Sequence, residues 1–257
     1  RHRHRVRHER GQHVRPQHAR AGDGHRSEAL DDSIRSVALG VWVGCGSRDE
    51  RASQAGLTHF LEHLLFRGST RYSAQEVAEL FDGIGGELNA ATTREYTVFY
   101  ARFLDEHLGM ALDVISDLVY QPALGEVDAE RSVVIEEIAG AEDAPHDLVH
   151  DLLSLGLFGT HPLGRPILGE VSTIASVSRR SLRAFHRARY VPSNVVVAAA
   201  GSVNHDRLVR DVRRFTNERA SAEASESPKR RLFRTSVPRG LFKRKRTEQV
   251  HFCAASV

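Results

Sequence analysis

The pattern of apolar and polar positions divides the chain into strand-like and helix-like segments. Apolar residues run almost without interruption over Ser36–Val43 and 194–200, the second typical of a central strand, and residues 95–103 are rich in β-branched and aromatic side chains. Apolar residues at helical spacing predict helices over residues 56–66, 73–81, 107–120, 128–141, 145–157, 180–189 and 206–215. Because strands and helices occur in runs rather than in strict alternation, we expect an α+β fold in which helices cover an antiparallel sheet.

The two ends of the chain differ from this central part. Residues 1–30 are packed with Arg and His and lack hydrophobic periodicity, so we expect a disordered tail. One domain is expected over residues 31–216, followed by a polar, Ala/Ser-rich linker over 217–231 and one more strand over 248–255. A basic tail can bind nucleic acid or a membrane surface. No nucleic-acid-binding motif accompanies the charge, so we interpret the tail as solvated and expect neither partner.

Composition limits the class of protein further. Of the 257 residues, 40% are hydrophobic and 27% are charged, which is ordinary for a soluble globular protein. No apolar run approaches the ~20 residues needed to cross a bilayer, and the N-terminus lacks the apolar stretch of a secretory signal. Cys45 and Cys253 are far apart and neither belongs to a CxxC pair. We therefore expect a reducing, cytoplasmic environment and no cysteine-based zinc site.

The clearest chemistry lies in the segment His59-Phe60-Leu61-Glu62-His63. His59 and His63 are four residues apart on a predicted helix, so both imidazoles leave the same face, which suits two nitrogen ligands of one zinc ion. Glu62 lies beside them and, without being a ligand, can take a proton from a water molecule whose pKa the metal lowers. This HxxEH order is the signature of inverzincins. The alternative is a helix whose histidines are merely exposed or hydrogen-bonded, and the five residues alone do not decide.

A catalytic zinc needs a third protein ligand, and the predicted helix over 128–141 offers Glu130, Glu136 and Glu137. Glu130 and Glu137 are seven residues apart and share a helix face, so one can bind the metal while the other supports a histidine. The alternative is a solvated acidic face. Val133 lies on nearly the same stripe and favours partial burial of that face.

Several segments together resemble the pitrilysin/insulinase family of zinc peptidases, which includes the mitochondrial processing peptidases. The matching segments are SVALGVWVGCGSRDE, GLTHFLEHLLFRGSTRYSA, GGELNAATTREYTVFYARFL, ERSVVIEEI, HPLGRPILG and YVPSNVVVAAAGSV. They follow one another in the family's order from Ser36 to Phe215, which makes the resemblance highly specific, and it is closest to short bacterial members.

The resemblance implies a role for each matching residue of the site. It implies one zinc ion per chain, bound by His59, His63 and Glu137, the second Glu of the EEI segment. Glu62 would be the general base, and Glu130 would be the carboxylate that supports the ligands. The function implied is that of a zinc-dependent endopeptidase that hydrolyses peptide bonds in extended peptides or unfolded segments.

The resemblance also implies how substrate and partner are bound. The segment GGELNAATT matches the strand that pairs with the substrate backbone, with Asn89 and Ala90 at the contact. Family members close two homologous αβ domains over the substrate, and here only the start of the second, residues 232–257, is present. We therefore expect a homodimer or a partner to supply a second domain. The alternative function is a non-catalytic, peptide-binding partner subunit, but such subunits typically lose motif residues that this chain retains.

Overall fold

The computed structural model describes residues 34–219, 230, 240–246 and 248–255, and its centre is a four-stranded antiparallel sheet of order β2-β3-β1-β4. The strands are β1 (Ser36–Val43), β2 (Glu87–Thr92), β3 (Thr97–Leu104) and β4 (Val195–Gly201). β1 pairs with both β3 and β4, so Val41 lies opposite Phe99 on one side and Val197 on the other. Within the described residues β4 is therefore an edge strand, and its prediction as a central strand is wrong. Its alanines and valines alternate between half-buried and exposed positions.

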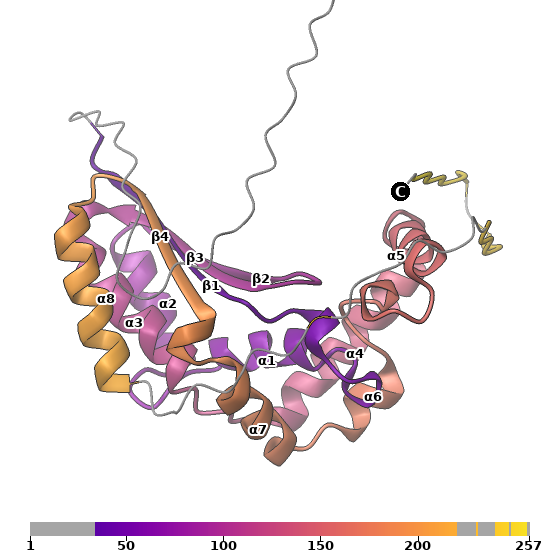
Figure 1. Ribbon diagram of the computed structural model, residues 1–257, viewed down its shortest axis with the longest axis horizontal. Helices are drawn as coiled ribbons and strands as arrows, with labels where there is room; N and C mark the ends of the chain where they lie inside the picture. Colours follow the sequence, from indigo (N-terminus) through magenta and orange to yellow (C-terminus); the bar gives the residue numbers. More distant parts are fainter. Residues whose placement is uncertain (1–33, 220–229, 231–239, 247, 256–257) are drawn as a thin grey trace, which may run out of the picture.

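The helices gather on one side of this sheet, and α5 lies beyond its end (Figure 1). They are α1 (Leu57–Phe66), α2 (Ala74–Gly83), α3 (Leu108–Tyr120), α4 (Val127–Asp143), α5 (Pro145–Phe158), α6 (Val171–Ser176), α7 (Arg179–Arg189) and α8 (His205–Arg219). Single-turn 3-10 helices lie at Ser47–Asp49, Ala52–Gln54, Asp105–His107, Pro162–Gly164 and Pro192–Asn194. The expected α+β fold is confirmed, and α6 is the helix that the apolar spacing did not predict.

The core lies between the sheet and the helices, with α1 at its centre. Six of the ten residues of α1 are buried. Leu39 and Phe99 project from the sheet into the same apolar cluster as Phe60 of α1 and Leu112 of α3. The opposite face of the sheet exposes large apolar side chains, among them Tyr100, Leu104 and Val196. Among the described residues, none of the helices combines the length and apolarity that a bilayer crossing requires.

The start of α1 is fixed by a close approach of two glycines. Gly56 has φ +89° and Gly169 has φ +77°, values that favour glycine. A Cβ on Gly56 would lie 2.3 Å from the backbone oxygen of Leu168, and a Cβ on Gly169 would lie 2.2 Å from that of Ala55. Side chains at these positions would push the chain around residue 168 away from the first turn of α1, so the glycines place that helix.

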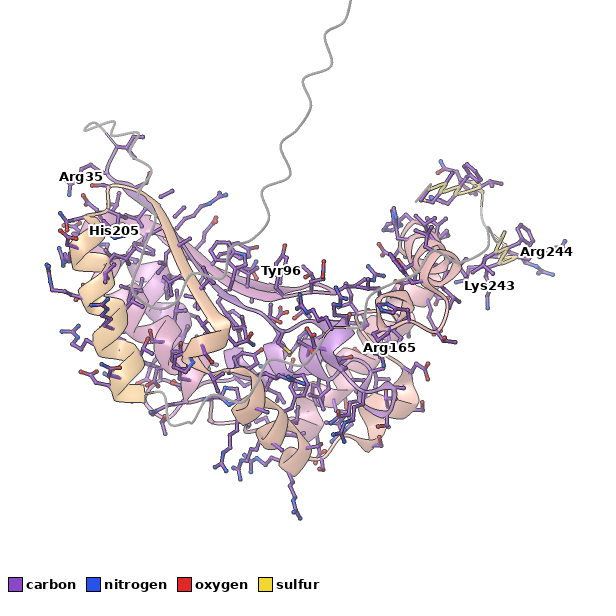
Figure 2. The ribbon with its side chains drawn as sticks, in the orientation of Figure 1. Arg35, Tyr96, Arg165, His205, Lys243 and Arg244 are labelled. Carbon is purple, nitrogen blue, oxygen red and sulfur yellow. The ribbon has the colours of Figure 1, made fainter. Side chains whose placement is uncertain are left out.

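The C-terminal part of the described chain corrects one prediction. The strand expected over residues 248–255 is not formed, because no described strand offers its backbone groups a partner. The segment instead lies beside α5, where the rings of His146 and His251 have centroids 6.5 Å apart. In the stretch before it, Figure 2 places Lys243 and Arg244 beyond α5, and Lys245 pairs with Asp143 at 3.1 Å. Val250 and Phe252 are 94% and 84% exposed. The tail over 1–30 and residues 220–229 of the expected linker lie outside the described residues.

Candidate metal and active site

Helix α1 carries the HxxEH residues at the boundary between core and surface. Its leucines and Phe60 are buried, whereas His59, Glu62 and His63 are half-buried. The helical repeat explains this division, because residues four apart lie on one face while the apolar positions face the sheet. The two imidazoles consequently sit one above the other, with ring centroids 4.5 Å apart.

Helix α4 packs against α1 and faces it with carboxylates. Val134 and Ile138 are buried and anchor α4, and Glu130 is buried with them. Glu136 and Glu137 are both exposed, and the Glu137 carboxylate lies beside His59 and His63 of α1. Val133, which the sequence placed on the buried stripe, is exposed, so that part of the prediction is wrong. A rotation of about 100° per residue separates Val133 from the buried Val134.

Three potential ligand atoms converge between α1 and α4. His59 Nε2 and His63 Nε2 are 3.2 Å apart, and Glu137 Oε2 lies 3.7 Å from the first and 3.4 Å from the second. Two atoms bound to one tetrahedral zinc ion at ~2.0–2.1 Å are about 3.4 Å apart, so this spacing fits a single ion. In the part of the chain that the structure describes, no other group of three or more His, Cys, Asp or Glu side chains is so close together.

The protonation of the histidines also suits a metal site. Burial, with a smaller contribution from the neighbouring His63, lowers the pKa of His59 to about 4, so His59 is neutral at pH 7. His63 Nδ1 lies 2.9 Å from a carboxylate oxygen of Glu130. An ionised carboxylate only accepts, so Nδ1 of His63 carries a proton, and Nε2, which faces His59 and Glu137, is the ring atom left to bind a metal.

Glu130 is held in place by a second partner, Arg67, which directly follows α1. Its side chain is 4% exposed, and it accepts a hydrogen bond from Arg67 Nε as well as from His63. Burial alone would raise the pKa of Glu130, but the hydrogen bonds from Arg67 and His63 outweigh it, and the pKa is lowered. An ionised carboxylate therefore orients the His63 ring from the side opposite the potential ligand atom.

Glu62 has a different partner from the three converging groups. Its carboxylate accepts a hydrogen bond from the hydroxyl of Thr92, the last residue of β2. Burial raises the pKa of Glu62 and the Glu137 carboxylate adds to the rise, while the Thr92 hydrogen bond and His63 oppose it. A carboxyl group with a raised pKa beside a metal site is suited to accept and return a proton.

Strand β2 leads from this site along the edge of the sheet. Asn89 and Ala90 lie on it opposite Tyr100 and Phe99 of β3, and no described strand pairs with its other side. The backbone N–H of Ala90 donates to Asn89 Oδ1 at 2.8 Å. A groove of about 620 Å³ runs between this strand and α2. Its apolar lining includes Phe66, Val77, Phe81 and Leu88.

The structure brings the predicted residues of α1 and α4 together and connects them to β2. Sequence reasoning missed two partners, Arg67 and Thr92. Arg67 lies four residues after His63, so helical spacing was a signal for it. Thr92 is 30 residues from Glu62, and no local pattern could indicate that contact.

An α+β fold in which the HxxEH helix faces a helix that carries carboxylates is the arrangement expected of the family that the motifs resemble. Residues 29–171, more than half of the chain, match the family "Insulinase (Peptidase family M16)". The chain belongs to this family, and the resemblance expected from its motifs is confirmed. Residues 176–256 match a second family described as "Peptidase M16 inactive domain". Strand β4 lies within the second match and pairs with β1, which lies within the first match. The two matched regions therefore contribute strands to one sheet.

The curated relatives are longer than this chain, and the match covers about half of each of them. It is 45% identical over 226 residues to the uncharacterized zinc protease YmxG of Bacillus subtilis, covering 86% of this chain and 54% of that protein. It is 44% identical over 201 residues to an uncharacterized zinc protease of Mycobacterium leprae, covering 77% of this chain and 45% of the relative. The chain thus spans about half the length of the curated relatives it matches.

Solved structures share the fold at low sequence identity. A protease from Helicobacter pylori superposes with a TM-score of 0.73 at 22% identity, covering 79% of this chain and 49% of the other. Pitrilysin superposes with a TM-score of 0.68 at 22% identity, covering 79% of this chain and 22% of pitrilysin. These structures support the architecture around the candidate site.

Proposed function

We propose that this chain is the zinc-binding part of an endopeptidase that hydrolyses peptide bonds in extended peptides. The observation that carries the proposal is the convergence of His59, His63 and Glu137, with Glu62 beside them. The spacing of the three ligand atoms fits one zinc ion, and relatives at 44–45% identity are named zinc proteases.

The residues around this centre divide the work of hydrolysis. A bound zinc ion would polarise the scissile carbonyl and lower the pKa of the attacking water. Glu62 takes the proton of that water and then returns it to the leaving amine. Thr92 holds the Glu62 carboxylate toward the end of β2, and Glu130 keeps the proton of His63 on Nδ1.

Substrate binds as an added strand on the free edge of β2. An extended peptide can pair with the backbone at Asn89 and Ala90, and a peptide carbonyl can replace Asn89 Oδ1 as acceptor of the Ala90 N–H. The groove beside this edge can receive apolar side chains of the peptide. Main-chain pairing makes modest demands on sequence, so extended segments of varied sequence are the expected class of substrate.

A second domain completes the enzyme. The chain spans about half the length of its curated relatives. Besides the metal ligands, hydrolysis needs hydrogen-bond donors to the developing oxyanion and surfaces that close over the substrate. We propose that a second domain supplies them, and a homodimer or a partner chain is one way to bring such a domain to this site.

The test measures zinc content and hydrolysis of an unstructured peptide on the same preparations. Where hydrolysis is detected, Glu62→Gln should abolish it and keep zinc, whereas His63→Ala should lose both. Zinc without hydrolysis would indicate an incomplete site. If neither zinc nor hydrolysis is found, the enzyme proposal is wrong and the alternative of a peptide-binding subunit is favoured.

A further inference from the structure

Arg230 joins two loops at the end of the sheet. Its Nε and Nη2 donate to the two carboxylate oxygens of Asp49, in the loop after β1, at 3.2 Å and 3.0 Å. Nη2 also donates to the backbone oxygens of Glu95 at 2.6 Å and Gly44 at 3.4 Å. The Glu95 carboxylate lies 3.6 Å from Nη1. One guanidinium from the expected linker over 217–231 therefore contacts both the loop after β1 and the turn between β2 and β3.

Asp49 depends on this contact because its side chain is only 2% exposed. Among the described residues, its other hydrogen bond is from the N–H of Gly46, at 3.1 Å. A buried carboxylate is costly unless it is paired, so within the described part of the chain loss of Arg230 would leave Asp49 with a single backbone donor. The planar fork of an arginine matches the two carboxylate oxygens and the backbone acceptors at once. The two residues are 181 positions apart, so the pair ties residue 230 back to the first loop of the domain.

The loop after β1 leads directly to the candidate metal ligands. Asp49 is followed by Glu50, which is buried and whose carboxylate accepts the N–H of Gly56 at 2.9 Å and that of Thr58 at 2.7 Å. These amides lie at the start of α1, immediately before His59. Glu50 thus caps the helix that carries the HxxEH residues, and it directly follows Asp49 in the chain.

The turn between β2 and β3 leads to the same site from the other side. Glu95 is three residues after Thr92, whose hydroxyl donates to Glu62. The Thr93 side chain and backbone bond to Tyr96 and close the turn. A residue that holds Glu95 therefore also fixes the end of β2 at which Glu62 is bound.

We infer that Arg230 is a positioning residue, whose docking onto Asp49 and Glu95 fixes the first turn of α1 and the end of β2. It would couple the position of residue 230 to the geometry of the candidate active site. The effect on α1 follows from the contacts above. Its consequence for zinc binding rests on the proposed function.

The experiment compares the full 257-residue chain with Arg230→Ala, Arg230→Lys and Asp49→Asn. The matched control is Lys245→Ala, which also removes a basic contact of the C-terminal part, but with an exposed carboxylate, Asp143. Two quantities are measured: hydrogen exchange of the amides of Gly56 and Thr58, and the dissociation constant of zinc. The first does not depend on metal binding, so it separates failure of this inference from failure of the proposed function.

We expect Arg230→Ala to accelerate exchange at Gly56 and Thr58 and to weaken zinc binding, each by about 2- to 30-fold. Arg230→Lys should recover part of the loss, and Asp49→Asn combined with Arg230→Ala should be no worse than Asp49→Asn alone. If Gly56 and Thr58 exchange no faster in Arg230→Ala than in Lys245→Ala, the inference is wrong. If they exchange faster in Arg230→Ala but the dissociation constant of zinc is unchanged, Arg230 is not coupled to the metal site. If the unmodified chain binds no zinc, the proposed function fails, and exchange alone decides the role of Arg230 in placing α1.

Discussion

Replacing Glu130 by Gln tests how the metal ligands are oriented. The substitution keeps the shape of a side chain that is 4% exposed but removes the charge that accepts from His63 Nδ1 at 2.9 Å and from Arg67. Without that charge, the His63 ring loses its fixed tautomer and its Nε2 becomes a weaker ligand. Loss of such a supporting partner typically costs 10- to 100-fold in metal affinity, which corresponds to about 1.4–2.7 kcal/mol.

The assay is competition for zinc with a chromophoric chelator at fixed pH and ionic strength. Glu136→Gln is the matched control, because it makes the same change of charge on the same helix at an exposed position. Thermal unfolding of both variants in the presence of chelator shows whether the metal-free folds remain equally stable. We expect Glu130→Gln to bind zinc at least tenfold more weakly than Glu136→Gln. A difference of less than about twofold would refute the orienting role of Glu130.

Three further predictions concern reactivity, pH and completeness. Burial raises the pKa of Cys45 to about 12, so iodoacetamide at pH 8 should label Cys253 alone in the folded chain, and mass spectrometry showing two labels would contradict this. Burial lowers the pKa of His186 to about 4, against an ordinary value near 6.5. The unfolded chain therefore takes up a proton that the folded chain does not as the pH falls from about 6.5 to 4, and stability should fall by up to about 3 kcal/mol over this interval. In urea titrations His186→Gln should lose that part of the slope, and an unchanged slope would contradict the reasoning. Finally, the chain alone should bind one zinc ion yet hydrolyse an unstructured peptide little above background, and robust turnover by a monomer would show that one domain suffices.

The parts of the site that depend on local spacing could be predicted from the sequence. A helix places residues four apart on one face, so the pairing of His59 with His63 followed from the helix alone. The third ligand did not follow in this way, because Glu130, Glu136 and Glu137 all lie on one helix and its rotation against α1 is a matter of packing. Only the family resemblance selected Glu137, whose carboxylate lies beside both histidines. That it binds metal stays a prediction.

The parts that depend on distant contacts could not be predicted. The partner of Glu62 is set by the register of β2 in the sheet, and the partner of Asp49 lies 181 residues away. The sequence pattern over 248–255 is that of a strand, but a strand exists only where another offers backbone partners, and none does among the described residues. The apolar run of β4 likewise predicted a central strand, because periodicity reports burial but does not report the number of neighbouring strands.

The most direct test of the account is the position of zinc in a crystal of the zinc-loaded chain, located by anomalous scattering at the zinc edge. We predict one peak per chain, about 2.0–2.2 Å from His59 Nε2, His63 Nε2 and a carboxylate oxygen of Glu137, with Glu62 outside the coordination sphere. A peak bound by Glu62 or Glu136 in place of Glu137, or no peak between α1 and α4, would contradict the assignment of the site.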